Sequence, residues 1–119
     1  MRRIIFALFL VAFLAACAPA LAPTVERANG DVIVTVTANQ AVYAVSVSIL
    51  DAVTNDARCA AIASDAYCLL GDLERGQVAT LVVTGEFGVA CTAAGFLRED
   101  QALSSYRPFR CEVRSALTE

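Results

Sequence analysis

Hydrophobic and polar residues alternate with a period of two over much of the chain after residue 30. In the first such segment Val32, Val34 and Val36 fall on one side and threonines fall on the other. Alternation of this kind, rich in valine and threonine, is typical of β-strands that bury one face. The pattern therefore predicts a strand at 32–37, and residues 38–41 are expected to turn the chain into the next strand.

The same period continues toward the end of the chain. In the second segment Tyr43, Val45, Val47 and Ile49 alternate with Ala and Ser. Further strands are expected on both sides of residues 62–65, at 77–84, at 87–97 and from Pro108 onward. Six or seven short strands, with no amphipathic helix of useful length after residue 30, predict an all-β fold, a small antiparallel β-sandwich.

The first 17 residues follow a different pattern. Arg2 and Arg3 precede an unbroken apolar run that is too short to cross a bilayer as a helix, which needs about 20 residues. A basic start before a short apolar run is typical of a secretory signal peptide. The run ends in Leu14-Ala15-Ala16-Cys17, which resembles the lipobox of bacterial lipoproteins.

The lipobox resemblance implies that the chain is cut before Cys17, that the thiol carries diacylglycerol and that the new amino terminus is acylated. More than one acyl chain is needed for a stable anchor, so the membrane is the expected partner. The alternative is ordinary cleavage after Ala22, but Pro23 follows and makes a poor substrate. Because Ala18 rather than Asp follows the cysteine, the outer membrane is the expected location in a cell with two membranes.

These patterns divide the chain into four parts. Residues 1–16 are expected to be a signal peptide, and residues 17–30, with two prolines and no periodicity, a lipidated tether. Residues 31–116 are expected to form the sandwich, and residues 117–119 a short tail.

Four cysteines remain when Cys17 is set aside. An even number in a small exported domain indicates disulfides, and their spacing does not match a zinc site. Three pairings are possible, and the parity of the flanking strands favours Cys59–Cys68 and Cys91–Cys111. A redox-active pair is the alternative, but Cys-x-x-Cys spacing is missing.

The amino-acid composition excludes several catalytic mechanisms. The chain is 58% hydrophobic, much of it in the leader, and it has no His and no Trp; all of its basic residues are Arg. A histidine base, a Ser-His-Asp triad and a lysine Schiff base are therefore excluded, and neither an enzyme nor a cofactor is expected. The net charge of −3 argues against nucleic-acid binding.

Two carboxylate pairs and a set of arginines are the remaining candidate sites. Asp72 with Glu74, and Glu99 with Asp100, can bind Ca²⁺ or exchange protons, although charged turns are usually solvated surface, and no metal site is expected. The arginines of the last segment and one tyrosine are the candidate surface for binding a partner: Arg98, Tyr106, Arg107, Arg110 and Arg114. An edge strand protected from aggregation by charge is the alternative explanation.

The stretch from Cys68 to Thr80 resembles the conserved-repeat immunoglobulin-like domain of prokaryotic surface proteins. The matching pattern is Cys-x-Leu-Gly-x-Leu-x-x-Gly-x-x-Ala, in which Gly71 and Gly76 permit turns and Leu70 and Leu73 close one end of the sandwich. The resemblance implies an immunoglobulin-like sandwich that acts as a non-catalytic spacer, adhesion or envelope module. The family's first strand has no counterpart among the strands expected here.

Together these features predict a membrane-anchored envelope lipoprotein whose β-sandwich serves binding, adhesion or structural support. The expected partners are the membrane, through lipidated Cys17, and an unknown envelope protein or polymer. The alternative is a small inhibitor or periplasmic ligand binder that uses the loop at residues 98–107.

Overall fold

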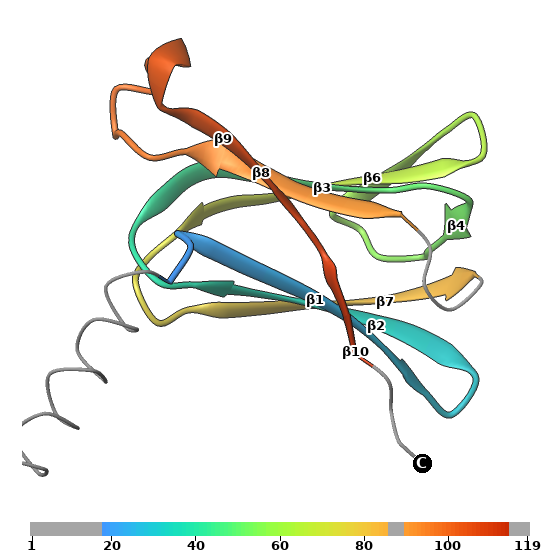
Figure 1. The fold of residues 1–119 in the computed structure, drawn as a ribbon. Coiled ribbons are helices and arrows are strands. Elements are labelled where there is room, and N and C mark those ends of the chain that lie inside the picture. The colour runs from blue at the N-terminus through green and yellow to red at the C-terminus, as the bar shows by residue number, and fades with distance from the viewer. Residues whose placement is uncertain (1–17, 86–89, 115–119) are drawn as a thin grey trace, which may run out of the picture.

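Two five-stranded β-sheets face each other in the structure (Figure 1). The computed structural model describes residues 18–85 and 90–114, and the ten strands named below lie in these ranges. The predicted signal peptide, Cys17, Phe87 and the tail at 117–119 lie outside the described residues. The expected all-β sandwich is confirmed, although the described residues form ten strands where six or seven were expected.

The first sheet has the strand order β10-β1-β2-β7-β4. Its members are β1 (Leu21–Ala28), β2 (Asp31–Ala38), β4 (Ala52–Val53), β7 (Val78–Gly85) and β10 (Glu112–Arg114). The neighbouring strands are antiparallel, except that β10 runs parallel to β1. The first strand of the chain and the last one described therefore lie side by side.

The second sheet has the order β5-β6-β3-β8-β9, and all of its pairs are antiparallel. Its members are β3 (Val42–Ile49), β5 (Cys59–Ile62), β6 (Asp65–Leu73), β8 (Cys91–Phe96) and β9 (Tyr106–Arg110). A single 3₁₀ turn, η1 (Leu103–Ser105), precedes β9. The chain crosses between the sheets at β2–β3, β3–β4, β4–β5, β6–β7, β7–β8 and β9–β10.

The core lies between the sheets and consists mainly of valines. Val34 and Val36 of β2 and Val47 and Ile49 of β3 have no exposed surface. Their alternation with half-exposed Thr and Ser confirms the predicted inward faces. Each fully buried side chain of this size contributes roughly 1.5–3 kcal/mol relative to an exposed one.

The expected tether at 17–30 is wrong over most of its length. Residues 21–28 form β1, and Leu21, Pro23 and Val25 alternate into the core. β10 pairs with β1 only from Thr24 onward, so the outer edge of β1 is unpaired at Pro23, where a proline is tolerated. β1 thus supplies a first strand that the sequence pattern did not predict.

Two details of the second sheet also differ from the prediction. Ala44 has a positive φ of 52°, and the pairing of β3 shifts on both sides of it, as at a β-bulge. Val42 is therefore buried in the place expected for Tyr43. Gly71, expected in a turn, lies inside β6 with a φ of 79°, opposite Val45 next to this bulge.

The last predicted strand is divided in two. β9 pairs with β8 in the second sheet, Cys111 crosses to the first sheet, and β10 then pairs with β1. Pro108 lies in the middle of β9, which is an edge strand, rather than at its start.

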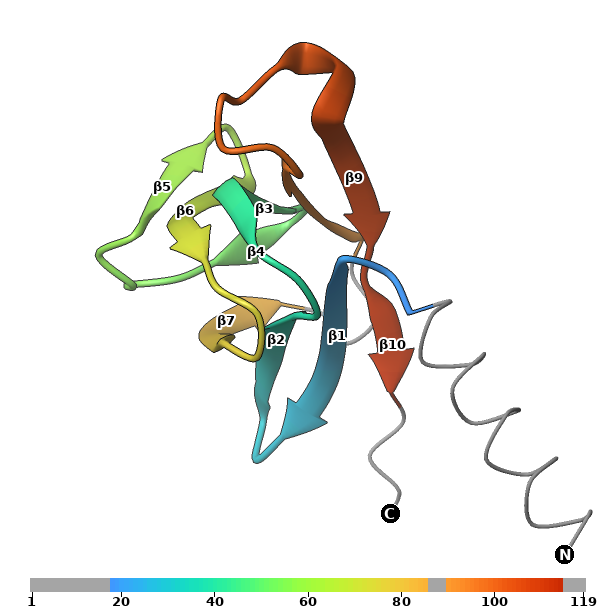
Figure 2. The ribbon, with the colours of Figure 1, turned by 90° about the vertical axis from the view of Figure 1, so that its left-hand side faces the viewer.

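The strands bring the connections together at two ends of the sandwich. The proximal end carries the start of β1, the turns at 39–41 and 74–77, and the loop at 97–105, because Leu21 pairs with Ala38 and Phe96 with Tyr106. The distal end carries the turns at 29–30, 50–51 and 63–64. Figure 1 shows the proximal end on the left, and Figure 2 views the molecule from that side. In the described part of the chain, no helix has the length and apolar character needed to cross a membrane.

Candidate functional site

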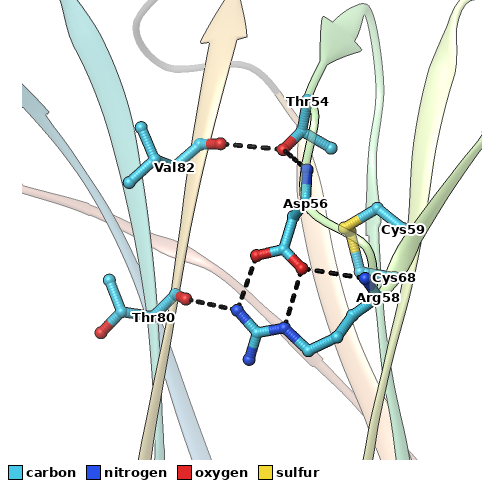
Figure 3. Close-up of a disulfide and its surroundings, with 7 residues drawn as sticks. All are labelled: Thr54, Asp56, Arg58, Cys59, Cys68, Thr80 and Val82. Carbon is cyan, nitrogen blue, oxygen red and sulfur yellow. Dashed lines mark hydrogen bonds and ion pairs between the residues drawn. A yellow bond between two sulfur atoms is a disulfide. The ribbon is translucent and has the colours of Figure 1, made fainter.

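Both predicted disulfides are present. Cys59 and Cys68 pair directly across β5 and β6, and Cys68 is fully buried (Figure 3). Cys91 at the start of β8 is bonded to Cys111, whose N–H donates to the Cys91 carbonyl at 3.0 Å. This second disulfide lies where the chain passes from β9 to β10, so it fixes the crossover between the sheets.

A polar clamp of Thr54, Asp56 and Arg58 precedes the first disulfide (Figure 3). The Arg58 guanidinium donates to both Asp56 carboxylate oxygens, at 2.9 and 2.7 Å, and the Arg58 N–H donates to Asp56 Oδ1 at 2.9 Å. The guanidinium also donates to the Thr80 carbonyl of β7 at 2.9 Å, and the Thr54 hydroxyl donates to the Val82 carbonyl at 2.9 Å. The clamp therefore ties the connection between β4 and β5 to the edge of β7.

Hydrogen bonds set the protonation of the clamp. The bonds from the Arg58 side chain and backbone lower the pKa of Asp56 from 3.8 to about 2. The same carboxylate raises the pKa of Arg58, so both groups are ionised at neutral pH. A polar hollow of about 400 Å³ lies beside the clamp, but the charges facing it are already paired. The clamp acts as a cover for the β7 edge, which would otherwise offer free carbonyls to another strand.

In each candidate carboxylate pair the aspartate accepts a backbone N–H. Asp72 accepts the N–H of Ala44 at 2.9 Å and so supports the β-bulge. Asp100 forms an ion pair with Arg98 at 2.8 Å and accepts the N–H of Ala102 at 3.1 Å. Within residues 18–85 and 90–114, no three His, Cys, Asp or Glu side chains gather as a metal site would require.

The predicted arginine surface is split into two groups. Arg98 and Arg107 lie at the proximal end, where Arg107 donates to the Ser104 and Tyr106 carbonyls. Arg110 and Arg114 instead line an open hollow of about 370 Å³ between β1 and the segment from β9 to β10. Both side chains are exposed, but the crossover at Cys111 separates them from the first group. Tyr106 packs edge-on against Phe96, with ring centroids 5.2 Å apart.

The distal end has an apolar surface that the sequence did not indicate. Leu50, Val53 and Ile62 are 45%, 68% and 59% exposed. A small hollow of about 80 Å³ is lined by Val53, by five alanines of β4, β5, β6 and the turn between β5 and β6, and by Thr54, Ser64 and Asp65. Asp65 accepts the Asp51 N–H at 2.9 Å and thereby fixes the turn at 50–51 against the β5–β6 hairpin.

Sequence reasoning missed the clamp and two exposed features, the distal surface and Leu103. The Asp-x-Arg spacing at 56–58 is the only local signal for the clamp, and its contact with Thr80 lies 22 residues away. For Leu103 a signal was available, since it is the one large aliphatic residue in the polar stretch at 98–107.

The comparisons with known proteins support the N-terminal assignment. The family description "Prokaryotic membrane lipoprotein lipid attachment site" matches residues 1–18, which contain the lipobox and Cys17. The match supports a bacterial lipoprotein that is anchored to a membrane through its lipidated cysteine. No curated protein sequence matches the chain.

Two solved structures share a distant likeness in shape. One is the GH20 exo-β-N-acetylglucosaminidase from Vibrio harveyi with N-acetylglucosamine, at 10% identity and a TM-score of 0.45. The other is an inactive mutant of that enzyme, at 9% identity and a TM-score of 0.46. Each match covers 81% of this chain but 18% of the enzyme. A likeness at this level supports no statement about activity.

Proposed function

We propose that the protein is a non-catalytic, membrane-anchored binding module of the bacterial cell envelope that holds a protein partner at its distal end. The observation that carries the proposal is the exposure of three large apolar side chains at the distal end, Leu50, Val53 and Ile62. The lipid is attached at the opposite end, next to the start of β1, so the distal surface faces away from the anchoring membrane.

The shape of the distal surface favours a protein over a metabolite. Small-molecule pockets usually enclose about 300–1,000 Å³. The distal hollow has a volume of about 80 Å³, which suits one apolar side chain of a partner. An exposed Val53 side chain at such a hollow, with alanines as most of its lining, resembles the apolar centre of a protein interface.

A non-catalytic role is supported by what the polar side chains do. Asp56, Asp65, Asp72 and Asp100 each accept backbone N–H groups or pair with arginine. These carboxylates therefore stabilise turns and strand edges in the described residues.

The cell envelope is the proposed location, with the outer membrane favoured in a cell that has two membranes. An immunoglobulin-like spacer role belongs to the same proposal.

Inhibition of an envelope hydrolase by the loop at 98–107 is the alternative. The braced conformation of the loop suits insertion into an active site, but its place at the proximal end turns it toward the membrane. A hydrolase recovered with the native protein and lost when residues 99–104 are replaced by a short turn would favour this alternative.

Site-specific photocrosslinking in native envelopes tests the proposed function. A photoreactive residue at Ile62 is expected to give one dominant protein adduct, and one at Glu26, exposed on the outer face of β1, is the matched control. Val53→Asp should weaken the adduct about thirtyfold, the equivalent of about 2 kcal/mol at an interface hot spot. Equal adducts at both positions, or none at Ile62 in a folded protein, would overturn the proposal.

A further inference from the structure

The sandwich is held very close to its lipid anchor. The Asn39 N–H donates to the Ala20 carbonyl and its side-chain amide donates to the Pro19 carbonyl, both at 2.8 Å. Only Ala18 therefore separates the fixed part of the domain from Cys17. Two Cα steps span at most about 7 Å. The headgroup layer of one leaflet is about as thick, roughly 5–7 Å, so the proximal end must rest on the headgroups.

The loop at 97–105 is the most prominent feature of that end, on the left of Figure 1 and at the top of Figure 2. Leu103 lies in η1 and is 84% exposed, the highest value among the large apolar side chains that the structure describes. A single exposed leucine on a soluble surface is unremarkable. This one differs because it stands on the end that the anchor brings to the bilayer.

The loop is rigid enough to hold Leu103 outward. The Ser105 hydroxyl and N–H both donate to the Ala102 carbonyl, at 2.7 and 2.8 Å. The Leu97 N–H donates to the Ser105 carbonyl at 3.0 Å, and Ser105 is buried. Because the conformation is already formed, insertion of the leucine requires little additional ordering.

The proximal end has no excess of positive charge. Two arginines and three carboxylates lie in its turns and loop: Arg75, Arg98, Glu74, Glu99 and Asp100. Arg107 of β9 and Asp72 of β6 adjoin them and add one charge of each sign. General attraction to anionic lipid is therefore weak, and an apolar contact is left as the driving force.

We infer that the loop at 97–105 is a second membrane contact, in which Leu103 inserts into the lipid surface beside the anchor and fixes the orientation of the sandwich. The Leu103 side chain lies at the boundary between the headgroups and the acyl chains, and the surrounding Arg and acidic side chains stay at headgroup level. This inference depends on the lipid anchor but not on any partner of the distal end.

A fluorescence experiment tests the contact directly, because the chain has no tryptophan. The mature lipidated protein carrying Leu103→Trp is reconstituted into phosphatidylcholine vesicles with brominated acyl chains. Its emission should shift to the blue and be quenched. The matched control, Ile62→Trp, places the reporter on the distal end, where emission should resemble that in water and escape quenching.

Three further observations make the test decisive. Ser104→Trp, at the neighbouring exposed position, serves as a second reporter, and circular dichroism checks that each variant is folded. Vesicles with added phosphatidylglycerol should give the same quenching, since the proximal end has no excess of positive charge. Unquenched emission from both loop reporters, or quenching that requires the anionic lipid, would overturn the inference while leaving the anchor and the distal surface intact.

Discussion

Gly95 offers a direct test of how closely β3 and β8 pack at the β-bulge. It is buried in β8, and a methyl group there would lie 2.5 Å from Val42 Cγ1. The same methyl would lie 3.2 Å from the Tyr43 carbonyl oxygen and 3.3 Å from Val45 Cγ2. One of these atoms belongs to the backbone, so rotation of a side chain does not relieve the whole clash. Gly95→Ala should therefore destabilise the fold.

The size of the effect follows from two opposing terms. Overpacking a core by one methyl typically costs about 1–3 kcal/mol. Replacing glycine by alanine also reduces the entropy of the unfolded chain, which returns about 0.4–1 kcal/mol. The net loss should be about 1–2 kcal/mol, and at 4–8 °C per kcal/mol for a domain of this size the melting temperature should fall by about 4–16 °C.

Thermal and urea unfolding of the oxidised domain, followed by circular dichroism, measure this loss. Val42→Ala removes the nearest methyl, so Gly95→Ala combined with Val42→Ala should be more stable than the sum of the single effects by about 1 kcal/mol. If Gly95→Ala is as stable as the wild type, or the two changes are simply additive, the proposed close approach at the bulge is refuted.

Three further predictions concern the clamp, a disulfide and the anchor. Asp56→Asn should lower the melting temperature near neutral pH. The difference from the wild type should disappear as the pH falls from about 4 to about 2, because the lowered pKa makes the ionised Asp56 stabilising only above that range. Thermal melts at stepped pH measure this difference, and a difference that stays constant with pH would contradict the prediction. Replacing Cys91 and Cys111 by Ser should cost about 3 kcal/mol in urea unfolding, as expected for a separation of 20 residues, and a loss below 1 kcal/mol would speak against this role for the crossover bond. Cys17→Ser should abolish incorporation of labelled fatty acid, whereas continued labelling would reject the lipid anchor.

The sequence pattern predicted the parts of the fold that depend on neighbouring residues. The inward faces of β2 and most of β3 follow from alternation alone, because each strand buries one side. Both disulfides follow from parity as well, since Cys59 and Cys68 flank a short hairpin. β1 was missed because its alternation is short and includes a proline. Leu21, Pro23 and Val25 share the inward face, but prolines at 19 and 23 are typical of a loop.

Local sequence patterns did not predict the features that depend on contacts between residues far apart in the chain. The bulge at Ala44 exists because Asp72 and Gly71 lie opposite it on β6, and it reversed the expected side of Tyr43. The contact of Arg58 with Thr80 joins separate sheets. The division of the arginine surface depends on the crossover at Cys111, and a two-residue alternation does not reveal where a chain changes sheets.

The parallel pairing of β10 with β1 also determines when the domain can form. An exported chain is threaded across the membrane with its amino terminus first, so β1 emerges long before residues 112–114 do. Its outer edge stays unpaired until the last part of the domain has been translocated, because β10 alone covers it. Completion of the first sheet is therefore a post-translocational event, and during export the nascent β1 edge is open to chaperones or to pairing with other chains.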